Sequence, residues 1–216
     1  GVGRKLSLLL FVEGITLIST GYIDLFLTAT ARALEWYPAW YRAEEIVHTA
    51  GDCAMLALYP PFLAAALKTR MTRVFAGRRM QIGLFVAATV LCVFVLTSPH
   101  KYGATLLYLM LSLLFAYALV ASIHAWYTAA GRAARTRAGI FALAFGFRDI
   151  CWGFAYSGAI YMIWFGRYLV VDPEASGAPY IVYALGTLIA VPLIAYGVLR
   201  TQLFDIDLRI RWTIRQ

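Results

Sequence analysis

Long apolar runs separated by short polar connections dominate the pattern along this chain. A helix needs about 20 mainly apolar residues to cross a bilayer. None of the runs shows the two-residue alternation of outer-membrane barrel strands, and lipid favours helices because they bond their own backbone groups. The pattern therefore predicts an all-α integral membrane protein, a six-helix transmembrane bundle with spans at 6–30, 46–67, 80–97, 104–127, 138–165 and 180–199.

The predicted bundle forms one domain over residues 1–200, and residues 201–216 follow it as a cytoplasmic amphipathic tail. From Asp205 the tail alternates polar and apolar residues, which is a strand period. An isolated strand is unstable, so we expect the tail to need a partner chain, a downstream segment or the membrane surface. A longer parent chain with seven or more helices is compatible with this pattern.

Composition narrows the class of protein. Hydrophobic types make up 62% of the 216 residues and charged types 14%, whereas soluble domains average about 45–50% and about 25%. This balance excludes a soluble enzyme, a disordered regulator and a nucleic-acid-binding domain. The three cysteines all fall in apolar runs, which favours small buried side chains over a disulfide framework.

Basic residues gather in alternate connections. The connections at 68–79 and 128–137 and the tail are rich in Lys and Arg, whereas the connections at 98–103 and 166–179 each hold a single basic residue. Short cytoplasmic loops carry the excess of Lys and Arg. The sequence thus predicts a bacterial-type inner membrane protein with both chain ends cytoplasmic. We expect its partners to be the lipid bilayer and other membrane chains or a second copy, and not nucleic acid.

The predicted external connection at 31–45 differs from the others because it is rich in Trp and Tyr. These side chains favour the membrane interface. We expect an interfacial half-helix on the outer leaflet, with a lid over an outward-facing pocket as the alternative.

Ionisable residues inside predicted spans are the main functional candidates, because such groups are costly in lipid and usually face the bundle interior. Glu13 lies about 10 Å and Arg148 about 15 Å from the cytoplasmic side, at about 1.5 Å per residue. An intramembrane pair between them is therefore possible, either as a structural ion pair or as a proton or ligand relay. The neighbouring Asp149 is expected to point away from Arg148.

A second candidate group lies near the predicted outer surface. Asp24 lies in the outer part of the first span, and His48 and Asp52 lie one helical turn apart in the second. Imidazole and carboxylate groups bind zinc, and histidine changes charge near neutral pH. These three residues are therefore candidates for a metal or proton-sensing site. The alternative is a hydrogen-bonded network or an exposed, hydrated interface.

The predicted fifth span carries a strip of small residues on one face. Such strips allow close packing of membrane helices, so we expect this span near the centre of the bundle. The strip consists of Ala142, Gly146, Gly153 and Ser157.

Catalytic signatures are absent from the sequence. It contains no HExxH, no GxSxG, no P-loop and no GxGxxG. We therefore expect no catalytic activity and no cofactor. His48 and His124 leave haem or pigment ligation open as an alternative, although their predicted depths differ and a di-haem site needs matched pairs.

The tail carries one resemblance to a known family. Leu203, Phe204, Asp205, Ile206 and Asp207 directly follow the last span. This LFDID run resembles the membrane-exit segment of bacterial multi-span sensor histidine kinases. The resemblance implies a sensory membrane bundle that passes a signal to a cytoplasmic transmitter. The phosphoacceptor histidine box and the ATP-binding lobe are missing here, so it implies no kinase activity.

These observations together favour a membrane sensor, that is, a signal-input or interaction module in signal transduction. Two alternatives remain. One is an accessory subunit of a larger membrane complex, and the other is a small transporter, which should show related halves. The sequence shows no clear internal repeat.

Overall fold

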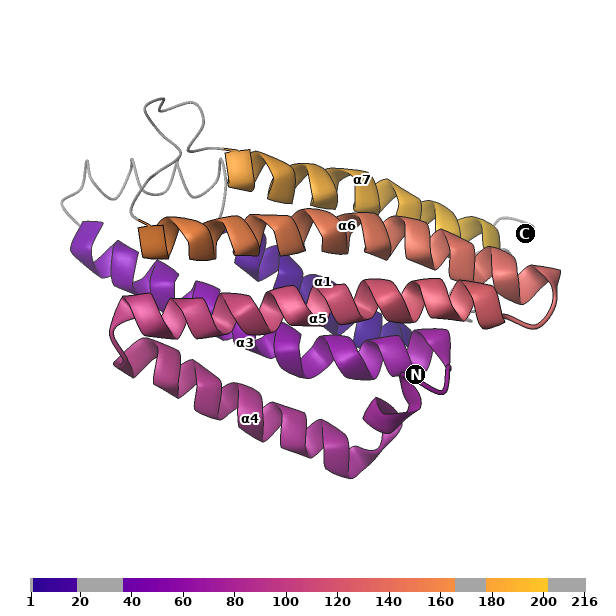
Figure 1. Cartoon of the computed structure of the whole chain (residues 1–216), viewed down its shortest axis with the longest axis horizontal. Helices are drawn as coiled ribbons and strands as arrows, with labels where there is room; N and C mark the ends of the chain where they lie inside the picture. Colours follow the sequence, from indigo (N-terminus) through magenta and orange to yellow (C-terminus); the bar gives the residue numbers. More distant parts are fainter. Residues whose placement is uncertain (1, 19–36, 166–177, 202–216) are drawn as a thin grey trace, which may run out of the picture.

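The computed structural model describes residues 2–18, 37–165 and 178–201, and regular structure in these ranges is entirely helical (Figure 1). This confirms the all-α prediction for the described residues. The elements are α1 (Val2–Ile18), α3 (Tyr37–Leu67), η1 (Arg73–Ala76), α4 (Arg78–Thr97), α5 (His100–Thr128), α6 (Arg132–Phe165) and α7 (Ala178–Thr201).

Four of these helices, α3 to α6, are long and apolar enough to cross a membrane. The 17 described residues of α1 and the apolar stretch Leu185–Ile194 of α7 are shorter. Each predicted span overlaps one helix, but four crossing helices stand against the six predicted.

The described part of helix α3 begins at Tyr37, so the helix extends beyond the span predicted from residue 46. Residues 37–45 continue the helix without a break. Pro38 is compatible with this start, because backbone N–H groups in the first turn of a helix make no intrahelical hydrogen bond and proline lacks only that group. At about 1.5 Å per residue, 31 residues reach roughly 46 Å, which exceeds the roughly 30 Å of bilayer hydrocarbon. The aromatic-rich segment is thus, from Tyr37 on, part of α3.

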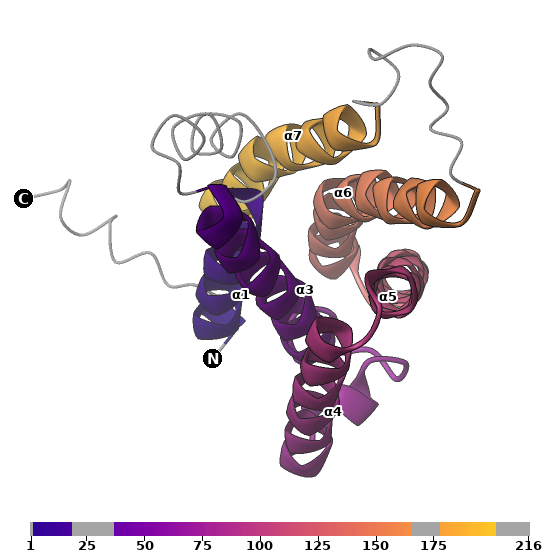
Figure 2. The ribbon, with the colours of Figure 1, turned by 90° about the vertical axis from the view of Figure 1, so that its left-hand side faces the viewer.

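Helix α6 has helices on two sides but keeps an exposed apolar face that includes Leu143, Ile150 and Phe154, so the predicted position at the centre of the bundle was wrong. It packs against α5 on one side and α7 on the other, while α3 packs against α1, α4 and α5 (Figure 2). Side chains of α6 also reach α1 and α3. Helix α4 packs least against the other helices. Of its apolar 18-residue stretch 11% is buried inside the bundle, against 61% for the corresponding stretch of α3.

The small-residue strip of α6 packs against α5. A Cβ atom on Gly146 would lie 3.0 Å from Leu119 Cδ1, and one on Gly153 would lie 3.8 Å from Phe115 Cβ. Farther along, the Ser157 and Ser112 hydroxyls lie 3.3 Å apart. Small residues therefore bring the two helices together, as the sequence predicts.

Most of the described basic residues lie at one end of the bundle, with Arg42, Lys101 and Arg148 as the exceptions. The start of α1, η1, the connection from α5 to α6 and the end of α7 share this end (Figure 1). Lys5 near the start of α1 donates to the Pro61 carbonyl near the end of α3, at 3.5 Å. We call this the basic end and the other the distal end.

Close packing between α6 and α7 yields a first prediction. A Cβ atom on Gly186 would lie 2.6 Å from Cys151 Cβ, so Gly186→Ala should push the helices apart. We expect it to lower the free energy of unfolding in mild detergent by about 1–3 kcal/mol. Adding Cys151→Gly should recover part of this loss, whereas Gly83→Ala, with no atom within 4 Å, should be neutral or stabilising. A neutral Gly186→Ala would contradict this packing.

Candidate functional site

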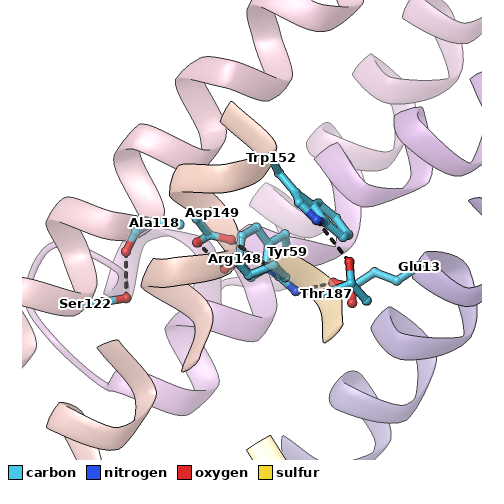
Figure 3. Close-up of polar contacts among 8 residues, drawn as sticks. All are labelled: Glu13, Tyr59, Ala118, Ser122, Arg148, Asp149, Trp152 and Thr187. Carbon is cyan, nitrogen blue, oxygen red and sulfur yellow. Dashed lines mark hydrogen bonds and ion pairs between the residues drawn. The ribbon is translucent and has the colours of Figure 1, made fainter. Parts of the chain in front are cut away.

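Arg148 lies at the centre of the described bundle and is 1% exposed. Its Nη1 donates to Glu13 Oε1 on α1. Its Nε and Nη2 donate to Asp149 Oδ1 at 3.1 and 2.8 Å (Figure 3). The predicted pair between Glu13 and Arg148 is therefore present. One guanidinium lies between two carboxylates, which is the arrangement that a buried charge requires.

Asp149 does not point away from Arg148, so this part of the prediction was wrong. Neighbouring helical residues project about 100° apart, but the long arginine side chain folds back to its neighbour. The other carboxylate oxygen, Oδ2, accepts a 2.6 Å hydrogen bond from the Tyr59 hydroxyl on α3. We call Glu13, Tyr59, Arg148 and Asp149 the arginine cluster, which connects α1, α3 and α6.

Three aromatic rings surround the Arg148 guanidinium. The centroids of Tyr59, Phe145 and Trp152 lie 4.8, 4.7 and 4.8 Å from Arg148 Cζ. These distances fall within the roughly 6 Å reach of a cation–π contact. Trp152 also donates from Nε1 to Thr187 Oγ1 on α7 at 3.2 Å (Figure 3). The rings hold the arginine in place and connect it to a fourth helix.

A second group of polar side chains lies toward the distal end. Asp52 is fully buried, and its Oδ1 accepts a 2.8 Å hydrogen bond from the Tyr156 hydroxyl of α6. Its Oδ2 lies 3.4 Å from Nε2 of His48, whose side chain is 20% exposed. We call His48, Asp52 and Tyr156 the histidine cluster. It joins a partly exposed imidazole to a buried carboxylate.

The same seven-residue spacing between an aspartate and a tyrosine occurs on both helices that form the two clusters. Asp52 and Tyr59 lie seven residues apart on α3, and Asp149 and Tyr156 lie seven residues apart on α6. Each aspartate accepts from the tyrosine of the opposite helix. Seven residues are two turns, about 10 Å, so antiparallel helices bring both pairs into register. The two pairs therefore exchange the roles of α3 and α6, as a local two-fold relation between these two helices would.

Phe115 of α5 connects the two clusters. Its ring centroid lies 6.2 Å from Tyr59 and 6.0 Å from Tyr156. It also meets Trp152 edge-on at 5.6 Å. Packed rings therefore link the two clusters.

The structure brings most of the predicted site residues together, and one of them lies outside the described ranges. Glu13, Arg148 and Asp149 come together, as do His48 and Asp52. Asp24 lies outside the described residues, as does the tail from residue 202 on. Within the described ranges no three His, Cys, Asp or Glu side chains form a metal-binding group. The metal site of Asp24, His48 and Asp52 stays a prediction.

The haem or pigment alternative gains no support from the positions of the histidines. His48 lies in the distal part of α3, whereas His124 lies four residues before the end of α5 at the basic end. Nδ1 of His124 is buried and has no hydrogen-bond partner among the described residues. The two imidazoles therefore occupy opposite ends of the bundle.

Sequence reasoning missed the two tyrosines, although a signal for them exists. Both helices carry an aspartate followed by a tyrosine seven residues later. A hydroxyl two turns from an intramembrane acid lies on the same helix face. It can donate a hydrogen bond to an acid on an antiparallel neighbouring helix.

Comparison of the chain with protein-family models, with curated proteins and with solved structures found no match.

Proposed function

We propose that this chain is a membrane-embedded signal-input module without catalytic activity of its own. The observation that carries this proposal is the coupling of a partly exposed histidine, through Asp52 and Tyr156, to a buried arginine cluster. Ionisable groups inside a membrane are expensive, and are by default functional candidates. A purely structural core could do without them, because apolar replacements of buried ion pairs are often equally stable.

The proposed signal starts at His48. A change in its charge alters the field at Asp52, which holds Tyr156 on α6. Helix α6 then shifts relative to α3 about the second contact, between Tyr59 and Asp149. Both helices reach the basic end, where the shift becomes available to a partner. The arrangement supplies the coupled element that transmission between distant sites requires.

The proposed setting is a bacterial-type inner membrane that all six helices cross. The basic end faces the cytoplasm, because short cytoplasmic loops carry the excess of Lys and Arg. The distal end, with the histidine cluster, then faces outward. We propose a homodimer or other membrane chains as partners of the basic end.

Spin labels can test this coupling. They would be attached at Arg70→Cys and Ala134→Cys, two exposed positions at the basic end, in a chain whose three native cysteines are replaced by alanine. Between pH 8 and pH 5.5, where histidines change charge, we expect the distance between the labels to change by about 1–5 Å, the scale of known helix shifts.

The control variant is Asp52→Asn, which keeps the size of the side chain and removes its charge. This variant should accumulate in the membrane and melt normally, yet its label distance should no longer respond to pH. An unchanged distance in the parent chain would reject a proton input at His48. A loss of folding in Asp52→Asn would make the histidine cluster structural.

The reciprocal pairs of aspartate and tyrosine favour a small transporter as the second candidate. Many transporters bind substrate between inverted repeats near the bilayer midplane, and α3 and α6 meet through such a two-fold relation. Uptake of a proton or solute by liposomes containing the purified chain alone would support this candidate. The accessory-subunit alternative stays a prediction, and purification in mild detergent with a partner at fixed stoichiometry would support it.

A further inference from the structure

A groove of about 380 Å³ lies at the basic end, between the last turn of α5 and the first turns of α6. Trp126 of α5 forms one wall. The opposite wall is a single stripe of α6 whose members recur every three or four residues, so they share a helix face. The stripe consists of Arg132, Arg135, Thr136, Gly139, Ile140 and Leu143.

The chemistry of the groove changes along its length. Arg132 and Arg135 lie one turn apart at the start of α6, and both are exposed. In the described part of the chain, neither guanidinium has an ion-pair partner, and the lining of the groove contains no acid. Leu143, 58% exposed, lies eight residues beyond Arg135, about 12 Å deeper at 1.5 Å per residue. The groove is cationic at the basic end and becomes apolar along α6, away from that end.

Gly139 makes room for the groove. A Cβ atom at this position would lie 3.3 Å from Nε1 of Trp126. The indole is 41% exposed and lies at the depth where tryptophan favours the membrane interface. The glycine therefore leaves space beside a partly exposed indole.

We propose that this groove binds one anionic phospholipid molecule. Arg132 and Arg135 hold the phosphate, and the first part of an acyl chain lies along Ile140 and Leu143 beneath Trp126. Two features favour a lipid over a soluble phosphate compound. The groove continues into apolar surface below the arginines, and basic pockets at the cytoplasmic ends of membrane helices match anionic headgroups. This site lies at the opposite end from the proposed input at His48 and is independent of it.

Native mass spectrometry of the delipidated protein tests the proposal. Phosphatidylglycerol and phosphatidylcholine with identical acyl chains would be titrated separately, with inorganic phosphate as a soluble competitor. We expect phosphatidylglycerol to bind preferentially. The double variant Arg132→Gln/Arg135→Gln should bind it about 30-fold more weakly, from the usual effect of two basic residues near anionic lipid.

Two further variants separate a built site from general surface charge. Arg70→Gln/Arg73→Gln removes the same charge at the same end, outside the groove, and should keep the preference for phosphatidylglycerol. Gly139→Val leaves the charge unchanged but fills the groove, and should weaken binding. Equal losses in both arginine pairs, or full binding by Gly139→Val, would overturn the proposal. Displacement of the lipid by millimolar inorganic phosphate would do so too, since it would indicate a site for soluble phosphate.

Discussion

Replacing Arg148 with methionine is expected to lower the free energy of unfolding by about 3–5 kcal/mol, the usual result of leaving buried charges without their partner. The substitution keeps an unbranched apolar stem but removes every donor that Glu13 and Asp149 Oδ1 receive from the guanidinium. Both carboxylates are nearly inaccessible to solvent. Titration with denaturing detergent, followed by the fluorescence of the buried tryptophan, would measure the change.

Two comparisons make the Arg148 result specific. Arg135→Met removes an exposed arginine from the same helix and should change stability by less than about 0.5 kcal/mol. The double variant Glu13→Gln/Arg148→Met removes one of the orphaned charges, so it should be more stable than Arg148→Met alone. Additive losses in this double-mutant cycle would mean that Glu13 and Arg148 are not coupled.

Trp152→Ala is expected to cost a similar amount, about 3–5 kcal/mol, because it opens a large cavity in a packed core. The indole is fully buried and contacts two other helices as well as Arg148 on its own helix. Its ring meets Phe115 of α5 edge-on, and Thr187 of α7 accepts a hydrogen bond from its Nε1. Thermal unfolding in mild detergent would measure the loss.

Trp164 provides the matched control for Trp152. It lies on the same helix, is 44% exposed, and has a hydrogen bond from Nε1 to Thr105. Trp164→Ala should therefore cost less than about 1 kcal/mol. Trp152→Phe should recover most of the packing while losing the bond to Thr187. Equal effects of the two alanine variants would show that Trp152 is not the centre of the bundle.

The sequence predicts the helices better than their limits. Hydropathy locates the runs because a lipid solvent demands long apolar segments, but it cannot place the start of α3, where charged and apolar residues continue the same helix from Tyr37. The sequence also predicts close packing of α6, because glycines and serines on one face of this helix have few other roles at that spacing.

The candidate site was predicted only in part. Helical geometry places Glu13 and Arg148 at similar depths, and the pair forms. It also suggests that Arg148 and Asp149 diverge, but the flexibility of arginine overrides the direction of its Cα–Cβ bond. The tyrosine partners depend on how α3 and α6 register against each other, which no single helix encodes.

The long sequence separation within the arginine cluster has a consequence for synthesis. Arg148 follows Glu13 by 135 residues, which takes the ribosome about 7–27 s at roughly 5–20 residues per second. Throughout this interval Glu13 lacks the guanidinium that pairs with it in the folded chain, and Tyr59 and Asp52 lack their partners on α6. The synthesis of α6 thus supplies the hydrogen-bond partners of Glu13, Asp52 and Tyr59 together. A nascent chain that stops before α6 therefore keeps Glu13 without its arginine.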